Sequence, residues 1–123
     1  SDLAHELMER YRTKALDFLG EPASADAALD RMVLLFRQAA LESEMCLCGA
    51  LGVSSAALPP LVQTSAARFS RTLVDWLKHA PDAGRDLPFP PEAIVALLEG
   101  ALLLSVTARD PAFFERATLP LNP

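Results

Sequence analysis

The sequence predicts an all-α protein, and three observations lead to this fold class. Leu and Ala are the commonest residues, and both favour helices. Apolar side chains recur three or four positions apart in several long stretches that contain no proline. No stretch alternates apolar and polar residues for long, as a half-buried strand would. We therefore expect a compact bundle of five to six helices.

The length and the charge balance limit the number of domains and the kinds of binding partner. With 123 residues, 51% of them hydrophobic, the chain can bury one core, whereas two separate cores would each be marginal. We expect a single domain over residues 1–123. The formal charge of -5 gives the chain as a whole no electrostatic reason to hold nucleic acid, although it leaves a local basic patch open.

The sequence also argues against export and membrane insertion. The N-terminus lacks the basic stretch and apolar run of a signal peptide. The most apolar segment, residues 93–108, carries Glu99 and is shorter than the roughly 20 residues that a spanning helix needs. We therefore expect a cytoplasmic protein with no membrane partner.

The first helix is expected from about Asp2 to Leu19. Its apolar positions recur at helical spacing and predict this buried stripe: Leu3, Leu7, Tyr11, Ala15 and Phe18. Polar side chains, including His5, Glu9 and Arg12, occupy the other face. Gly20 is a candidate C-cap, and Pro22 prevents the helix from continuing.

The second helix is expected from Ser24, a candidate N-cap, to about Leu41. Its apolar side covers more than half of its circumference, which predicts a central position: Leu29, Met32, Val33, Leu34, Leu35, Phe36 and Ala40. A polar break follows, and residues 45–51 form a short apolar piece that ends at Gly52.

Prolines also mark the helices of the second half. A third long helix is expected from Pro59-Pro60 to Lys78-His79, with this buried stripe: Val62, Ala66, Phe69, Leu73, Trp76 and Leu77. Residues 81–91, which contain four prolines, are expected to form a loop, and a helix is expected over 92–108. Asp110-Pro111 predicts the N-cap and first turn of a last short helix over 112–117.

The helix at 92–108 is apolar nearly all round, which is more than a bundle of this size can cover. Gly100 and Ala101 lie in its middle, although glycine costs about 1 kcal/mol there relative to alanine. Small residues let two helix backbones approach closely. The neighbour is either a helix of the same chain or the same helix of a second copy, and we favour a homodimer.

Motifs that carry catalytic or cofactor chemistry are missing from the sequence. It has no glycine-rich phosphate loop, no paired histidines of a zinc site and no nucleophile elbow. His5 and His79 are interpreted as surface histidines on different helices. Glu99, within an apolar helix, is assigned to the rim of an interface or to a cavity. We therefore expect no enzyme, no catalytic residue, no metal and no cofactor.

Cys46 and Cys48 are two residues apart, a spacing that places them on nearly opposite sides of a helix. They cannot easily bridge each other or share a metal ion. We interpret them as small apolar core residues. A thiol that senses oxidants or electrophiles is the alternative, and it would require exposure and a lowered pKa.

Large apolar side chains of the two central helices predict where a pocket would lie: Met32, Phe36, Phe69, Leu73 and Trp76. Apolar walls with few polar groups are typical of small-molecule pockets. The same residues also describe an ordinary filled core, and the sequence alone does not separate the two.

The order of several motifs resembles one family. Residues 7–12 read LMERYR, residues 46–52 read CLCGALG, residues 75–77 read DWL, residues 98–104 read LEGALLL, and residues 109–117 read RDPAFFERA. This succession, which covers essentially the whole chain, resembles the C-terminal ligand-binding and dimerisation domain of bacterial TetR-type transcriptional regulators. Cys46 matches the cysteine of a "GCL" subgroup, whereas Met45 replaces the glycine before it.

The resemblance implies an all-α domain that dimerises through a four-helix interface built from 92–108 and 112–117. The interface residues would be Leu97, Gly100, Ala101, Leu104, Phe113 and Phe114. A small, mostly apolar effector would bind among the remaining helices, at Tyr11, Met32, Phe36, Cys46, Phe69, Leu73, Trp76, Leu98 and Leu102. Operator DNA would be bound only through an N-terminal helix-turn-helix domain that this sequence does not contain.

The leading hypothesis is therefore the effector-binding and dimerising domain of a repressor. Two alternatives from other classes stay open. One is a helical protein-interaction module without a ligand, and the other is a protein that uses Cys46 or Cys48 as a sensing thiol or a nucleophile.

Overall fold

The computed structural model describes residues 2–42 and 60–121. Within these ranges it contains helices and no strand, so the expected all-α class is confirmed. The elements are α1 (Asp2–Leu19), α2 (Ala25–Leu41), α4 (Pro60–Lys78), α5 (Ala83–Asp86), α6 (Pro91–Ala108), α7 (Pro111–Ala117) and the 3-10 helix η2 (Leu119–Leu121). The predicted short piece at 45–51, with Cys46 and Cys48, lies outside the described residues.

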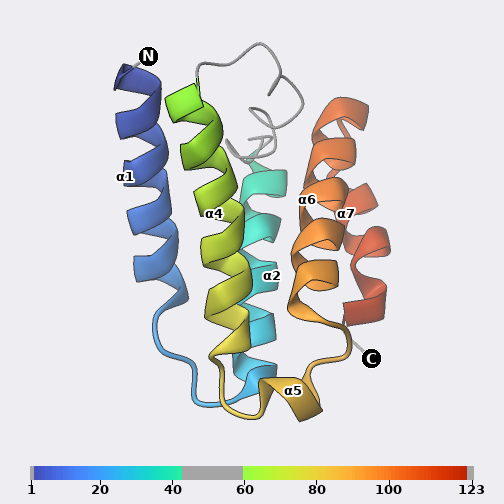
Figure 1. Ribbon diagram of the computed structural model, residues 1–123. Helices are drawn as coiled ribbons and strands as arrows, with labels where there is room; N and C mark the ends of the chain where they lie inside the picture. Colours follow the sequence, from blue (N-terminus) through green and yellow to red (C-terminus); the bar gives the residue numbers. More distant parts are fainter. Residues whose placement is uncertain (1, 43–59, 122–123) are drawn as a thin grey trace.

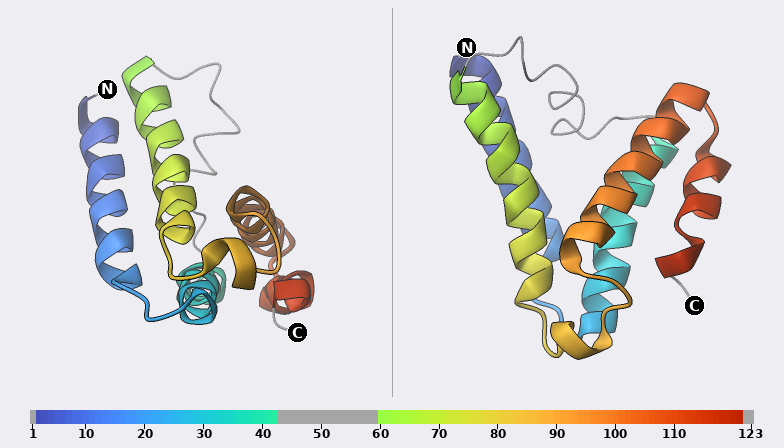
Figure 2. Two further views of the ribbon diagram at one scale, coloured as in Figure 1. Left: turned by 60° about the horizontal axis from the view of Figure 1, so that its bottom comes forward. Right: turned by 45° about the vertical axis from the view of Figure 1, so that its right-hand side comes forward.

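The long helices form a bundle that contains two parallel pairs of neighbours. Figure 1 shows that α1 and α4 run parallel and side by side, and that α2 and α6 both run in the opposite direction and pack on each other. Helix α6 packs on α2, α4 and α7, and α1 packs on α4 and α2. The parallel pair α1–α4 therefore forms one side of the bundle, and α7 covers the other (Figure 2).

The core lies where α2, α4 and α6 meet. It is built from aliphatic and aromatic side chains that are almost completely buried, chiefly Met32, Val33, Phe36, Phe69, Leu73, Leu77, Ile94, Leu98 and Leu102. Burying a side chain of this size stabilises the fold by about 1.5–3 kcal/mol. The stripes predicted for the second and third long helices are thus confirmed at these positions.

Helix ends follow the predicted cap residues. The Ser24 side chain accepts a hydrogen bond from the Ala27 N–H at 3.0 Å, and Asp110 caps α7 in the same way through Ala112 at 3.1 Å. Gly20 ends α1 with φ +65°, a left-handed conformation that glycine adopts without steric cost.

The buried stripe of α1 differs from the prediction. Leu3 and Leu7 are 72% and 51% exposed, whereas Met8 is completely buried together with Ala15 and Leu19. The reason is that α1 meets α4 through a polar row, so its buried side is rotated relative to the apolar spacing. His5, which we had assigned to the surface, belongs to that row and is half-buried.

The segment expected to be a loop at 81–91 contains the short helix α5. It follows Asp82, which has a left-handed backbone at φ 57°, and Arg85 bonds to Asp86 at 3.0 Å. This hydrogen bond lowers the pKa of Asp86 below its ordinary value. Helix α5 has only four residues, which make about one turn. The proline content of the segment gives no indication of so short a helix.

By length and composition α6 could cross a membrane, with a mean hydropathy of 1.6. A core position explains the same composition, because six residues of α6 are buried against the neighbouring helices. Glu92, in its first turn, has its pKa lowered by its own backbone N–H and by Lys78 of α4. This ion pair, at 3.1 Å, ties the start of α6 to the end of α4.

We expect Ser24→Ala to lower the free energy of unfolding by about 1 kcal/mol, because the first turn of α2 loses a side-chain acceptor for the Ala27 N–H. Urea unfolding followed by circular dichroism measures this change. Ser24→Asn is the control, since asparagine caps equally well and should cost only a few tenths of that amount. Equal losses in both variants would contradict a capping role.

Candidate functional site

A small apolar hollow lies at the meeting point of α1, α2, α4 and α6. Its lining combines aromatic and aliphatic side chains: Tyr11, Leu35, Phe36, Ala39, Phe69 and Leu102. Its free volume is about 10 Å³, room for roughly one water-sized molecule. The site is therefore nearly closed and would have to expand to admit a larger ligand.

A wider hollow of about 250 Å³ adjoins it between α1 and α2, because the two share Tyr11, Leu35 and Ala39. Its other lining residues are mostly polar: Lys14, Ala15, Gln38 and Glu42. A path with a polar mouth thus leads from the surface towards the apolar interior. Pockets for small molecules commonly combine apolar walls with a few polar groups in this way.

Tyr11 is the side chain that joins the two hollows. Its ring lies 5.1 Å from the ring of Phe69, at an interplanar angle of 44°. Tilted aromatic pairs at this separation attract each other by about 0.5–1.5 kcal/mol beyond their burial. Tyr11 therefore holds α1 against α4 at the inner end of the path.

The structure brings four of the nine predicted effector-binding residues to this hollow: Tyr11, Phe36, Phe69 and Leu102. Met32, Leu73 and Leu98 are also buried in the core but do not line the hollow. Trp76 lies elsewhere, at the C-terminal end of α4, and Cys46 is outside the described residues. We did not select Ala39, because a single alanine carries no signal for a pocket.

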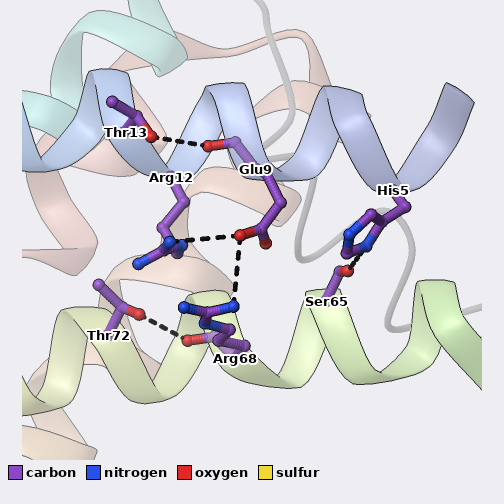
Figure 3. A network of polar contacts seen from close by, with 7 residues as sticks. All are labelled: His5, Glu9, Arg12, Thr13, Ser65, Arg68 and Thr72. Carbon is purple, nitrogen blue, oxygen red and sulfur yellow. Dashed lines mark hydrogen bonds and ion pairs between the residues drawn. The ribbon is translucent and has the colours of Figure 1, made fainter. Parts of the chain in front are cut away.

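A polar network joins α1 to α4 beside the hollow (Figure 3). Glu9 pairs with Arg12 on its own helix at 3.2 Å and with Arg68 of α4 at 3.4 Å. One turn towards the N-terminus, the His5 Nδ1 contacts the hydroxyl of Ser65, which is buried. The N-terminal half of α1 is thus held by these polar contacts to α4 together with the buried Met8.

This network is incompletely satisfied. The Oε2 atom of Glu9 and the Nε atom of Arg12 are both buried, and neither has a hydrogen-bond partner among residues 2–42 and 60–121. Buried polar atoms without partners cost about 1–3 kcal/mol each. This part of the α1–α4 contact therefore carries a cost that the neighbouring Tyr11–Phe69 ring pair does not have.

The described part of the chain leaves the outer face of α6 open. Leu104 is 51% exposed there, and Leu97 and Gly100 are half-buried. Phe113 of α7 is half-buried as well, whereas Leu119 beyond it is 63% exposed. These apolar residues form the outer α6–α7 face: Leu97, Gly100, Leu104, Phe113 and Leu119.

Two residues predicted for the dimer interface lie elsewhere. Ala101 and Phe114 are buried in the core of the chain itself, so they support this face from behind and cannot contact a partner directly. Gly100, in contrast, has open space around it: a Cβ atom there would meet nothing within 4 Å. Within residues 2–42 and 60–121, no helix of the same chain therefore approaches Gly100 closely, whereas Ala101 packs against its own chain.

The titratable groups that drew attention in the sequence stand apart from one another. His5 contacts Ser65, whereas His79 is exposed and its Nδ1 lies 2.7 Å from the carbonyl oxygen of Asp75. Glu99 is half-buried on α6 and lines neither of the two hollows. In residues 2–42 and 60–121, no three metal-binding side chains gather.

Comparisons with known proteins give one structural match. No protein-family model matches the chain, and no curated protein matches it significantly. The chain is similar to a solved structure of a TetR transcriptional regulator from Legionella pneumophila, with 23% sequence identity and a TM-score of 0.73. The match covers 98% of this chain and 71% of that chain.

At this level of identity the likeness establishes the fold. The match includes nearly the whole chain, so it extends to the helices that line the hollow and to the outer α6–α7 face. The resemblance predicted from the order of motifs is confirmed in this sense, and the chain folds as a TetR-like helical domain.

Proposed function

We propose that this domain senses a small, mostly apolar molecule and dimerises, as part of a bacterial TetR-type transcriptional regulator. The observation that carries the proposal is the apolar hollow between four helices of a TetR-like fold, reached through a polar mouth. The effector would place its apolar part among Tyr11, Phe36 and Phe69, and a polar group near Lys14 and Gln38. No catalytic step is assigned to the domain.

The proposed response to the effector follows from the size of the inner hollow. A ligand larger than a water molecule cannot enter unless the walls move apart. We expect α1 to be the wall that moves. Near the hollow it contacts α4 through the Tyr11–Phe69 ring pair and through the polar contacts of Glu9, and one buried oxygen of Glu9 has no partner among the described residues. Binding would thus shift α1 relative to α4.

The outer α6–α7 face is the proposed dimer interface. It pairs an open glycine with large apolar residues, which lets two copies of α6 approach closely across a two-fold axis. A DNA operator would be contacted by a helix-turn-helix segment outside these 123 residues, and the regulator would act as a repressor in the cytoplasm.

The two alternatives predict different behaviour. An interaction module would bind another protein through the same outer face and would be monomeric alone. A thiol sensor would depend on Cys46 or Cys48, which the described residues do not include, and it stays a prediction.

We expect Leu104→Glu to convert the dimer to a monomer, because a buried carboxylate at an apolar contact would lose its hydration. Sedimentation velocity at micromolar concentration measures the change. The control is Leu3→Glu, which places the same charge on an exposed leucine of α1. A wild-type monomer at these concentrations would contradict the proposed dimer.

Gly100→Leu tests close approach of the helices without adding charge. In the monomer the new side chain meets open space and α6 gains helix propensity, so folding should not suffer. In the dimer it separates the two copies of α6, and we expect the dimer dissociation constant to rise at least about tenfold. An unchanged dissociation constant, with intact circular dichroism, would show that α6 does not lie at the two-fold axis.

We expect Ala39→Phe to abolish binding of small aromatic probes such as indole, because Ala39 lines both hollows and a phenyl ring would block the path. Isothermal titration calorimetry should show at least about a tenfold loss of affinity. Ala67→Phe, on the exposed side of α4, is the matched control. Equal affinity in the two variants would place the ligand elsewhere.

A further inference from the structure

The C-terminal ends of α1 and α4 meet at one end of the bundle, because these two helices run parallel and side by side (Figures 1 and 2). The aligned peptide dipoles of a helix leave partial negative charge at its C-terminus. Parallel neighbours place two such ends together. The last turn of α1 contains no basic residue, and Lys78 at the end of α4 is paired with Glu92.

A surface pocket of about 670 Å³ opens between these two ends. Its lining comes from α1, from the connection to α2, and from the end of α4: Leu16, Asp17, Gly20, Glu21, Pro22, Trp76, His79, Ala80 and Pro81. The volume is in the range of pockets that hold small molecules. The pocket shares no lining residue with the proposed effector hollows.

Trp76 is held in a fixed orientation at this pocket. Its Nε1–H donates to the carbonyl oxygen of Gly20 at 2.8 Å, and this bond ties the end of α4 to the end of α1. The face of an indole ring carries negative partial charge and attracts cations more strongly than other aromatic side chains do. Because the ring is already fixed, binding would not have to order it.

The polar groups of the lining are also suited to a cation. Asp17 and Glu21 are its two charged residues, and both are acidic. The Nδ1 of His79 donates to the carbonyl oxygen of Asp75 at 2.7 Å, since a carbonyl can only accept. In the neutral ring Nε2 is then an acceptor.

One cation of a neighbouring element reaches this end of the bundle. Arg31 of α2 lies 4.3 Å from the centre of the Phe18 ring and donates to the Phe18 carbonyl oxygen, so it offsets part of the negative charge at the end of α1, but Phe18 does not line the pocket. The first turn of α2 contributes a further acid, Asp26. Throughout residues 2–42 and 60–121, neither Asp17 nor Glu21 forms an ion pair.

From these observations we propose that the pocket between the ends of α1 and α4 binds a small organic cation, an alkylammonium or guanidinium group. Trp76 packs against the cation, and Asp17 and Glu21 supply the opposite charge. This site is independent of the proposed effector hollow and of dimerisation.

The test uses tetramethylammonium as the probe and Trp76 as the reporter, since it is the chain's single tryptophan. Titration should change its fluorescence saturably, with a Kd of about 1 mM. tert-Butanol, which is similar in shape but neutral, should produce no saturable change, and sodium chloride keeps the ionic strength constant. No saturable change with tetramethylammonium, or an equal one with tert-butanol, would overturn the proposal.

Two double variants separate the pocket from net charge. Asp17→Asn with Glu21→Gln should weaken the binding at least about fivefold. Glu6→Gln with Asp30→Asn removes the same charge from exposed positions outside the pocket and should leave Kd unchanged. Equal weakening in both would overturn the site. If the first variant fails to fold by circular dichroism, Glu21→Gln alone, in the connection between helices, decides by the same criterion.

Discussion

The structure depends on α6, whose apolar surface is larger than residues 2–42 and 60–121 cover. Leu98 and Leu102 fill the centre of the core, and these contacts fix where α2, α4 and α7 can pack. The remaining side, with Leu104 and Gly100, faces outward. Exposed apolar surface on a helix is costly in water, so the fold requires either a partner for this side or a loss of stability.

The position of α6 also explains why α1 is attached differently from the other helices. Three helices already surround α6, so α1 packs mainly on α4 and α2. Its C-terminal half is anchored by Ala15, Leu19 and the Trp76–Gly20 hydrogen bond. Its N-terminal half is anchored by the buried Met8 and by the polar contacts of Glu9 and His5. Polar contacts of this kind rearrange at lower cost than an interdigitated apolar core.

The sequence predicted the helices well, because their ends depend on local chemistry. Ser24, Asp110 and Gly20 act within one turn of their own position, and each caps the helix expected. The buried side of α1 was not predictable in this way. Leu3 and Leu7 have the spacing of a core stripe, but burial depends on the partner helix, and α4 presents Arg68 and Ser65 to that side.

The candidate site was predictable only as a set of large apolar residues. Phe36, Phe69 and Leu102 line the hollow, whereas Met32 and Leu98, which have the same character, fill the core completely. The first group borders the hollow together with Ala39, whose small side chain fills little space. A single alanine carries no pattern in the sequence that would reveal such a hollow. A cavity is a property of packing between helices, so periodicity along one helix cannot reveal it.

In the proposed function, a single rigid element would join effector binding and dimerisation. Helix α6 places Leu102 in the inner hollow and, two residues later, Leu104 on the outer face. A helix is stiff along its backbone, so a ligand that pushes on Leu102 must either rotate α6 or displace the helices opposite it. Displacement of α1 is the easier response, since α6 is held on three sides and α1 by partly unsatisfied polar contacts. Under the proposed function, the ligand's effect would therefore be transmitted through α1, while α6 would keep the proposed dimer together.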